Sequence, residues 1–478
     1  MRKKILNLLL LLASTSIFLV SCQKEINREP VASEELSGRT ANRGHLKQTK
    51  TFSSDVVQQW LAVQTAMLYN STPAYGLKAN RWMAYCGVAL YEAVVPGMPA
   101  YQSLSDQLNE MPEMPKTEPG QAYHWPTCAN AALATITEKI FGANYNGSTG
   151  NKLRDDLNNA FQSEIGNDAT FTRSVEFGKQ VAQKIFDWSL TDNSGWPAVP
   201  YTYSYQVGLW WPANVPADQV ATIGSSLAYW GLTRTIVPGS INNTASPRPV
   251  YSEDPGSLYY QDMLEVYHVS KTLDMNQKIQ AKYYNDPGPR YPAGAHYFPI
   301  LKQVIEQLEP SLDIAALAYA KAGMSLMDAS IGSFYAKFLK TPAVTNITER
   351  PNQFIKRVLG PADLSAANWV PYIPTPGHPD FPSNHAVFSS SFAHALTTVL
   401  GDNVAFSNSA YAGIMEDLGG GQMVDLGTRH YTSFYDMMND IAFSRLYGGI
   451  HTRYACEEGM KQGRKTATNI HNTVKFLK

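Results

Sequence analysis

The segment 378–385, HPDFPSNH, concentrates residue types that can bind an anion or transfer a proton. It holds two of the 10 histidines of this 478-residue chain, together with a serine and an asparagine. The apolar run that follows predicts a helix with Ser383 or Asn384 as its N-cap. Because the first turn of a helix has free N–H groups and the positive end of the helix dipole, His385 and the Ser383 hydroxyl would stand at an anion-binding position.

A second group of candidate residues lies near the C-terminus, in SRLYGGIHTRY. Arg445 and His451 are six positions apart, which on one continuous helix would place them about 240° apart around its axis. Gly448 and Gly449 lie between them and can redirect the chain, so that both side chains would converge. An arginine offers a fixed fork of donors to an oxyanion, and a histidine can be a nucleophile or a ligand toward its central atom.

Further cations precede both groups. Lys337 and Lys340 lie in FYAKFLK, and Arg350 comes directly before Pro351. Charge-assisted hydrogen bonds contribute about 1.5–3 kcal/mol each, so several together predict tight binding of a tetrahedral oxyanion in a dry pocket. The same donors would also stabilise the trigonal-bipyramidal geometry of phosphoryl transfer.

The order of these motifs, a lysine, Arg-Pro, Pro-Ser-x-His and Ser-Arg-x5-His, resembles the superfamily of vanadium-dependent haloperoxidases and type 2 phosphatidic acid phosphatases. MDASIGSFYAK resembles the helix that carries the family's lysine, and WVPYIPTPGHPDFPSNH resembles its approach to the central motif. ANRWMAYCGVALYEAVV is similar to an N-terminal helix of the soluble, haloperoxidase-like branch. The resemblance covers most of residues 51–478 and implies an all-α helical bundle.

For the cofactor, the resemblance implies orthovanadate. Its equatorial oxygens would be bound by Lys337, Arg350 and Arg445, with help from the Ser383 hydroxyl and the Asn384 backbone amide. Lys337 would in addition polarise bound peroxide.

The resemblance also implies roles for three histidines. His385 would be the acid/base, and His451 would be the axial ligand of vanadium in a peroxidase or the phosphohistidine nucleophile in a phosphatase. His378 stands where the family's bromoperoxidases similarly have histidine and its chloroperoxidases phenylalanine, which favours bromide or iodide; a plain turn residue is the alternative. His394 and His430 lack metal-ligand spacing and are expected to be structural.

Two departures from the family pattern concern the cation and amide positions. The family usually spaces its lysine six residues before Arg-Pro, whereas twelve residues separate Lys337 from Arg350. We therefore expect an insertion, with Lys337 as the preferred lysine and Lys340 as the second choice. Asn384 replaces the usual glycine, but it still offers its N–H and tolerates left-handed backbone better than most residues.

A third departure concerns the last histidine. The aspartate that often follows it by four positions is Ala455 here. His451 then needs another partner to orient it, and the candidates are Asp440, Glu457 and Glu458.

The functional hypothesis is therefore a vanadate-dependent peroxidase that uses hydrogen peroxide to oxidise a halide. One alternative is an exported acid phosphatase that hydrolyses phosphate esters. Another is a non-enzymatic surface lipoprotein that binds an oxyanion and has lost catalysis. With 39 basic and 40 acidic residues, the net charge gives no reason to expect nucleic acid as a partner. The sequence leaves open whether the chain forms a homo-oligomer.

Helices must position these residues. Apolar residues recur at three- and four-residue spacing in many stretches, and sustained alternation is rare, so the sequence predicts an all-α protein. Within 190–300, stretches rich in proline, tyrosine and tryptophan predict long ordered loops that wall a site. The clearest helices are expected at residues 55–69, 79–95, 128–141, 174–190 and 314–339.

The chain is expected to have four parts. Residues 1–22 resemble a lipoprotein-type signal peptide, with Cys22 as the lipidated residue, and residues 23–50 form a polar tether. Residues 51–300 form an N-terminal helical region and residues 301–478 the catalytic helical core. This organisation predicts an exported protein of the periplasm or outer-membrane surface, held to the membrane only by its lipid anchor. Cys86 and Cys128 could form a disulfide in such a compartment.

Overall fold

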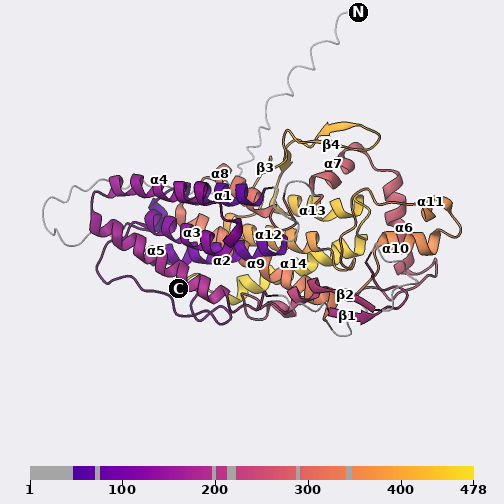
Figure 1. The fold of residues 1–478 in the computed structure, drawn as a ribbon, viewed down its shortest axis with the longest axis horizontal. Coiled ribbons are helices and arrows are strands. Elements are labelled where there is room, and N and C mark those ends of the chain that lie inside the picture. Colours follow the sequence, from indigo (N-terminus) through magenta and orange to yellow (C-terminus); the bar gives the residue numbers. More distant parts are fainter. Residues whose placement is uncertain (1–46, 70–75, 196–200, 213–221, 287–290, 341–346) are drawn as a thin grey trace, which may run out of the picture. The chain divides into compact units, whose positions relative to one another are not determined.

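The computed structural model describes most of the chain beyond its first 46 residues (Figure 1). The expected signal peptide and nearly all of the expected tether lie outside the described residues, and so does the segment 341–346, where we expect the insertion. The fold is mostly helical, as predicted. No helix in the described part is long and apolar enough to cross a membrane. The described residues are 47–69, 76–195, 201–212, 222–286, 291–340 and 347–478.

The N-terminal half begins with a layer of helices whose amphipathic sequences predict them well. Its exception is α4, whose sequence is mostly polar and which buries only Gly150 and Leu157. Its apolar residues Leu153, Leu157 and Phe161 nevertheless recur at four-residue spacing and pack on the core, and Asn146 caps it through its side chain; it was not among the expected helices. The helices are α1 (Asp55–Leu68), α2 (Gly76–Val94), α3 (Trp125–Phe141), α4 (Gly147–Ile165) and α5 (Asp168–Ser189).

The interval 190–300 is only partly loop. Among its described residues, two α-helices lie wholly within it, each started by a capping side chain: Ser257 accepts from an amide of α6, and Asp274 forms a capping box with Gln277 at the start of α7. These caps are the local signals that mark both helices in the sequence. The elements here are β1 (Tyr201–Ser204), β2 (Thr222–Ser225), α6 (Leu258–Lys271) and α7 (Met275–Tyr283).

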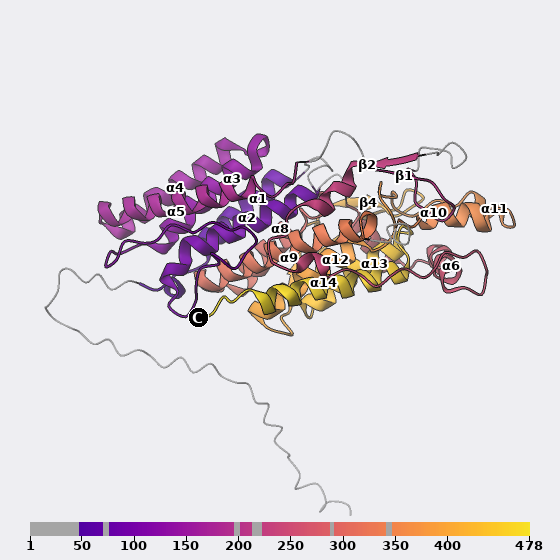
Figure 2. The same ribbon diagram turned by 90° about the horizontal axis from the view of Figure 1, so that it is seen from below.

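The C-terminal half is built around one long helix, α9, which is buried over nearly its whole length. A helix that is apolar on all sides belongs in the centre of a bundle, and α9 contacts α2, α12 and α14. Figures 1 and 2 both show these helices running alongside one another. The helices are α8 (Tyr297–Leu308), α9 (Leu312–Phe338), α10 (Pro351–Phe354), α11 (Leu364–Ala367), α12 (Asn384–Leu400), α13 (Phe434–Tyr447) and α14 (Arg453–Thr473).

Sheet structure is limited to small antiparallel pairs in the described residues, as the sequence predicted. β1 pairs with β2, β3 with β6 and β4 with β5. The remaining strands are β3 (Phe406–Asn408), β4 (Met415–Asp417), β5 (Met423–Asp425) and β6 (Arg429–Tyr431).

Glycines let the central helices approach closely. A Cβ on Gly87 of α2 would lie 2.6 Å from the Tyr319 carbonyl oxygen of α9, and one on Gly459 of α14 would lie 2.9 Å from the Ser383 carbonyl oxygen. Real Cβ contacts are longer, so a side chain at either position would push two helices apart. The second contact fixes α14 against the start of α12.

Two details differ from expectation at the edges of the fold. Lys47 and Thr49, at the end of the expected tether, already contact the helices: the Trp125 indole donates to the Lys47 carbonyl at 2.7 Å, and Thr49 is fully buried. The suggested disulfide is wrong, since Cys86 and Cys128 are both free, buried thiols. They face different neighbours, Cys86 toward α9 and Cys128 toward α5.

Candidate active site

The central motif lies at the start of α12. Ser383 is the N-cap and Asn384 the first helical residue, as predicted, and the Ser383 amide donates to the Ala455 carbonyl at 3.0 Å. The Ser383 side chain does not cap the helix, and its buried hydroxyl lies within hydrogen-bond reach of the Cys456 thiol, a weak partner that a ligand oxygen can displace. The hydroxyl is therefore available to a ligand oxygen.

Asn384 contributes its backbone and not its side chain. Its Oδ1 accepts a hydrogen bond of 2.6 Å from the Ser333 hydroxyl of α9. Its φ is not positive, so the tolerance of asparagine for left-handed backbone is not needed here. The amide stands in the first turn of a helix, where N–H groups have no intrahelical acceptor.

The chain changes direction at the glycine pair, as predicted, and the Arg445 charge then acts on His451, where it helps to lower the pKa of the imidazole. α13 ends at Tyr447, Gly449 adopts a φ of 74°, and α14 begins only at Arg453. Both Arg445 and His451 are buried, each with 1% of its surface exposed. The change of direction replaces the wide angular separation that one continuous helix would impose.

His451 is held by two groups of opposite character. Its Nδ1 lies 2.8 Å from the carboxylate of Asp380, and its Nε2 lies 3.0 Å from a guanidinium nitrogen of Arg350. The expected partners are wrong: the Asp440 carboxylate binds Arg429, and that of Glu458 binds Lys461. Asp380 lies inside the HPDFPSNH segment itself. The sequence therefore already showed a carboxylate, within a recognised motif, that could have been considered as the partner of His451.

His385 also has a carboxylate partner that the sequence did not reveal. Its Nε2 lies 3.1 Å from Asp286, just after α7. Burial raises the pKa of Asp286 to about 8, and burial together with the nearby Arg445 charge lowers the pKa of His385 well below 6.5. At neutral pH the pair is therefore a neutral imidazole beside a carboxyl that holds its proton.

The structure separates the two candidate lysines. Lys337 is fully buried and donates to carbonyls of the central loop, those of Pro379 at 2.9 Å and of Pro382. Lys340 donates instead to the Thr244 hydroxyl at 2.6 Å. Lys337 is thus the lysine at the site, where its ammonium also holds the central loop in place.

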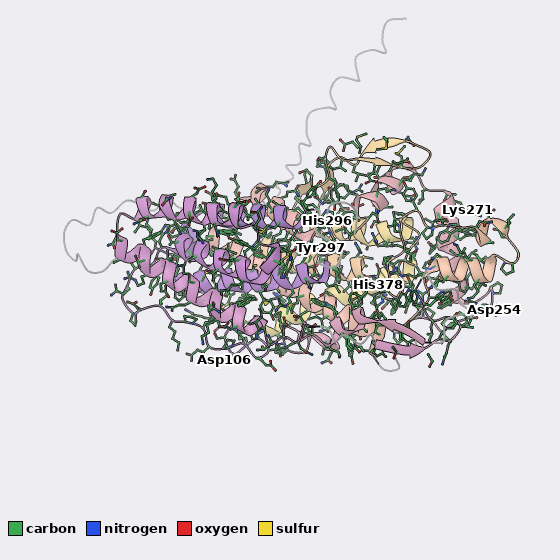
Figure 3. The ribbon with its side chains drawn as sticks, in the orientation of Figure 1. Asp106, Asp254, Lys271, His296, Tyr297 and His378 are labelled. Atoms are coloured by element: carbon green, nitrogen blue, oxygen red, sulfur yellow. The ribbon has the colours of Figure 1, made fainter. Side chains whose placement is uncertain are left out.

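Arg350 connects several parts of the site. Its Nε donates to the His378 carbonyl at 2.7 Å, and a terminal nitrogen lies 3.0 Å from His378 Nδ1. The His378 ring meets Phe334 edge-on, with 5.6 Å between centroids. Figure 3 labels His378 toward the middle of the view, with Asp254 and Lys271 at its edge. His378 therefore lines the site beside a cation.

Buried positive charge dominates the pocket. Burial lowers the pKa of Arg350 to about 9 and that of Arg445 to about 10, and it lowers that of Lys337 well below 10.5. Arg445 Nε is buried and makes no hydrogen bond with the described residues. Together with the Ser383 hydroxyl and the first amides of α12, these donors fit a multiply charged oxyanion.

The two histidines that were expected to be structural, His394 and His430, lie in hydrogen-bond networks away from the site. His394 Nδ1 is 2.6 Å from the Tyr435 hydroxyl, and His430 pairs with Ser407 at 2.8 Å. Neither contact involves a site residue.

Comparisons with known proteins match this geometry. The family model of the VCPO second helical-bundle domain matches residues 318–477, which contain all the predicted site residues. The C-terminal helical region of the chain therefore belongs to the vanadium haloperoxidase family. Within this family, the structure of a bacterial vanadium-dependent iodoperoxidase has a TM-score of 0.72 and 25% identity, over 89% of this chain and 98% of that chain.

A more distant haloperoxidase shares the fold. The holo-type bacterial vanadium-dependent chloroperoxidase has a TM-score of 0.59 and 15% identity, over 85% of this chain and 94% of that chain. No curated protein sequence gave a match. The expected family and fold are confirmed, while the individual residue roles stay predictions.

Proposed function

We propose that this haloperoxidase-family protein is a vanadate-dependent peroxidase that oxidises bromide or iodide with hydrogen peroxide. The observation that carries the proposal is the joint burial of Arg350, Arg445 and His451, all three of which act electrostatically on His385 in the first turn of α12. A pocket of this kind binds a tetrahedral oxyanion through charge-assisted hydrogen bonds.

The residues present fit vanadate. His451 would bind on the axial side through Nε2, and Arg350, Arg445, the Ser383 hydroxyl and the Asn384 amide would bind oxygens. Bound vanadate would supply the Lewis acid that activates peroxide. Since its Nε2 already faces a donor in this structure, His451 presents a lone pair and not a proton at that atom.

His385 would transfer the protons of peroxide. Its lowered pKa leaves the imidazole neutral at neutral pH, so it can accept a proton as peroxide binds and return it to a leaving oxygen. Asp286, 3.1 Å away, would orient the ring. Lys337 would polarise peroxide by exchanging one of its loop carbonyls for the ligand.

For the halide, the support is His378 and the iodoperoxidase likeness at 25% identity. The His378 ring has a nitrogen beside Arg350 and meets Phe334 edge-on, which places a polar group next to a cation of the site. This environment favours the more polarisable, more easily oxidised halides, so we place iodide and bromide before chloride.

A parallel assay tests the proposal against the phosphatase alternative. The chain without residues 1–22 is freed of bound oxyanions and assayed with iodide or bromide plus peroxide, with and without orthovanadate, and with a phosphate ester. We expect halide oxidation that requires vanadate. Ester hydrolysis that vanadate inhibits, without halide oxidation, would establish the phosphatase instead, and oxyanion binding without either reaction would indicate a non-enzymatic protein.

A further inference from the structure

The hydrogen bonds of His451 define its tautomer. A carboxylate can only accept a hydrogen bond and a guanidinium can only donate one. Since Asp380 faces Nδ1 at 2.8 Å and Arg350 faces Nε2 at 3.0 Å, the proton of the neutral ring must sit on Nδ1. Two independent contacts thus place the lone pair of the neutral ring on Nε2, where it faces Arg350.

The carboxylate comes from an unusual place in the chain. Haloperoxidase-like sequences often have it four positions after this histidine, but Ala455 stands there, fully buried against Phe381 and Ala245. This apolar cluster excludes a charged side chain. The residue next to Phe381 in sequence, Asp380, approaches the same histidine from the central loop.

Asp380 is itself held by a buried network. The Thr452 hydroxyl donates to its Oδ2 at 3.1 Å, and Arg248 Nη1 lies 3.5 Å from the same oxygen. Arg248 also donates to the Thr452 hydroxyl at 2.6 Å and pairs with Asp262 of α6 at 2.9 Å. Arg248 has no side-chain exposure, so its charge acts on these carboxylates with little screening.

We propose that Asp380, held by Arg248 and Thr452, is the positioning residue of His451 and replaces the carboxylate that is lost at Ala455. The interval 240–262, outside the catalytic core expected from sequence, thereby supports the axial histidine. The role toward vanadate rests on the proposed function, whereas the tautomer of His451 does not.

The first test uses the vanadate-free protein. Histidine ¹⁵N shifts, with His451 assigned by its loss in His451→Gln, report which ring nitrogen carries the proton. We expect Nδ1–H in the wild type. In Asp380→Asn the amide can donate to Nδ1 while Arg350 still donates to Nε2, so we expect part of the population to move its proton to Nε2 and the ring to become a mixture of the two tautomers. A wild-type Nε2–H tautomer, or an unchanged tautomer in Asp380→Asn, would overturn the proposal.

The second test measures the dissociation constant of orthovanadate by equilibrium dialysis. Loss of a ligand's outer partner typically weakens metal affinity about 10–100-fold, and we expect a loss in that range for Asp380→Asn. Glu265→Gln on α6 is the matched control; it pairs with the half-exposed Arg453 and should change neither readout. Affinity unchanged in Asp380→Asn would contradict the positioning role.

A third variant covers a failure of Asp380→Asn to fold. Arg248→Lys keeps the charge but cannot reach Thr452, Asp262 and Asp380 together, so we expect a smaller affinity loss of about 2–10-fold and a mixed tautomer. If Arg248→Lys keeps the wild-type vanadate affinity and the wild-type tautomer of His451, Arg248 does not help to hold Asp380. If the tautomer responds but the wild type binds no vanadate, the proposed function fails and the positioning role stands.

Discussion

Arg350 Nη1 contacts Nε2 of His451 at 3.0 Å and the Ile450 carbonyl at 2.7 Å, so one guanidinium nitrogen binds the histidine and its neighbour in the chain. The nitrogen that we assign to the cofactor is therefore already next to a cation. An arriving oxyanion would accept from the guanidinium while its central atom faces the imidazole, so that both contacts serve the same ligand.

Replacing Arg350 with lysine should weaken vanadate binding by at least about 10-fold, because an ammonium cannot reproduce the fork that contacts His378 and His451 at once. Equilibrium dialysis measures the change. Arg464→Lys, at an exposed position of α14, is the matched control and should bind as the wild type does. If Arg350→Lys binds vanadate as tightly as Arg464→Lys does, a positive charge at position 350 is enough for binding and the fork geometry of arginine is not needed.

The two lysines give a second prediction. Lys337→Met removes a buried cation that holds the central loop, so we expect a vanadate affinity about 10-fold lower or weaker still and slower halide oxidation. Among the described residues, Lys340→Met removes contacts with Thr244 and Ala245, and it should leave both quantities unchanged. The reverse ranking, measured on the same preparations, would mean that Lys340 is the family's lysine.

The pH dependence of stability gives a third prediction, through Asp286. Its pKa is raised on folding from 3.8 to about 8, so the folded protein binds this proton more tightly than the unfolded chain. The resulting stabilisation is complete below about pH 4 and is lost as the pH rises through 8. Asp286→Asn removes this dependence.

We therefore expect the Tm of Asp286→Asn, relative to that of the wild type, to rise by roughly 2 °C or more between pH 5 and pH 8.5. Differential scanning calorimetry at several pH values measures it. Asp254→Asn, at an exposed position, should show a constant offset. A Tm difference for Asp286→Asn that does not change with pH would contradict the raised pKa.

Local signals in the sequence identified several of the residues that the structure places at the candidate site. Ser383 as N-cap follows from a proline-fixed loop before an apolar run, and the convergence of Arg445 and His451 follows from a glycine pair. The partners Asp380, Asp286 and Arg248 were missed, because their role depends on contacts between segments far apart in the chain. No local pattern specifies which buried carboxylate faces which histidine.

The helices of the fold also divide into those that were predicted from local sequence patterns and those that were missed. The buried helices α2 and α9 are rich in apolar residues and were predicted, whereas the largely exposed α4 has a narrow apolar stripe in a mostly polar sequence and was missed. α6 and α7 lie in an interval whose prolines and aromatic residues suggested loops throughout. Their capping residues Ser257 and Asp274 were the available signals.

Gly449 gives a fourth prediction. Its φ of 74° would cost an alanine about 1–2 kcal/mol, and the new Cβ would lie 3.1 Å from the Trp369 ring. Because the strain is two residues from His451, we expect Gly449→Ala to lower both stability and vanadate affinity. Gly427→Ala is the matched control, with a φ of 68° and open space around it; it should lose stability only. Unchanged vanadate affinity in Gly449→Ala would show that the turn does not position His451.

The most direct test of the proposed chemistry is a stoichiometric titration of the oxyanion-free protein with orthovanadate, in which iodide oxidation by peroxide is followed at each addition. We predict activity that rises linearly and saturates at one vanadate per chain, and that is lost in His451→Ala. Iodide oxidation that is independent of added vanadate, or that is equal in His451→Ala, would contradict a vanadate centre at this histidine.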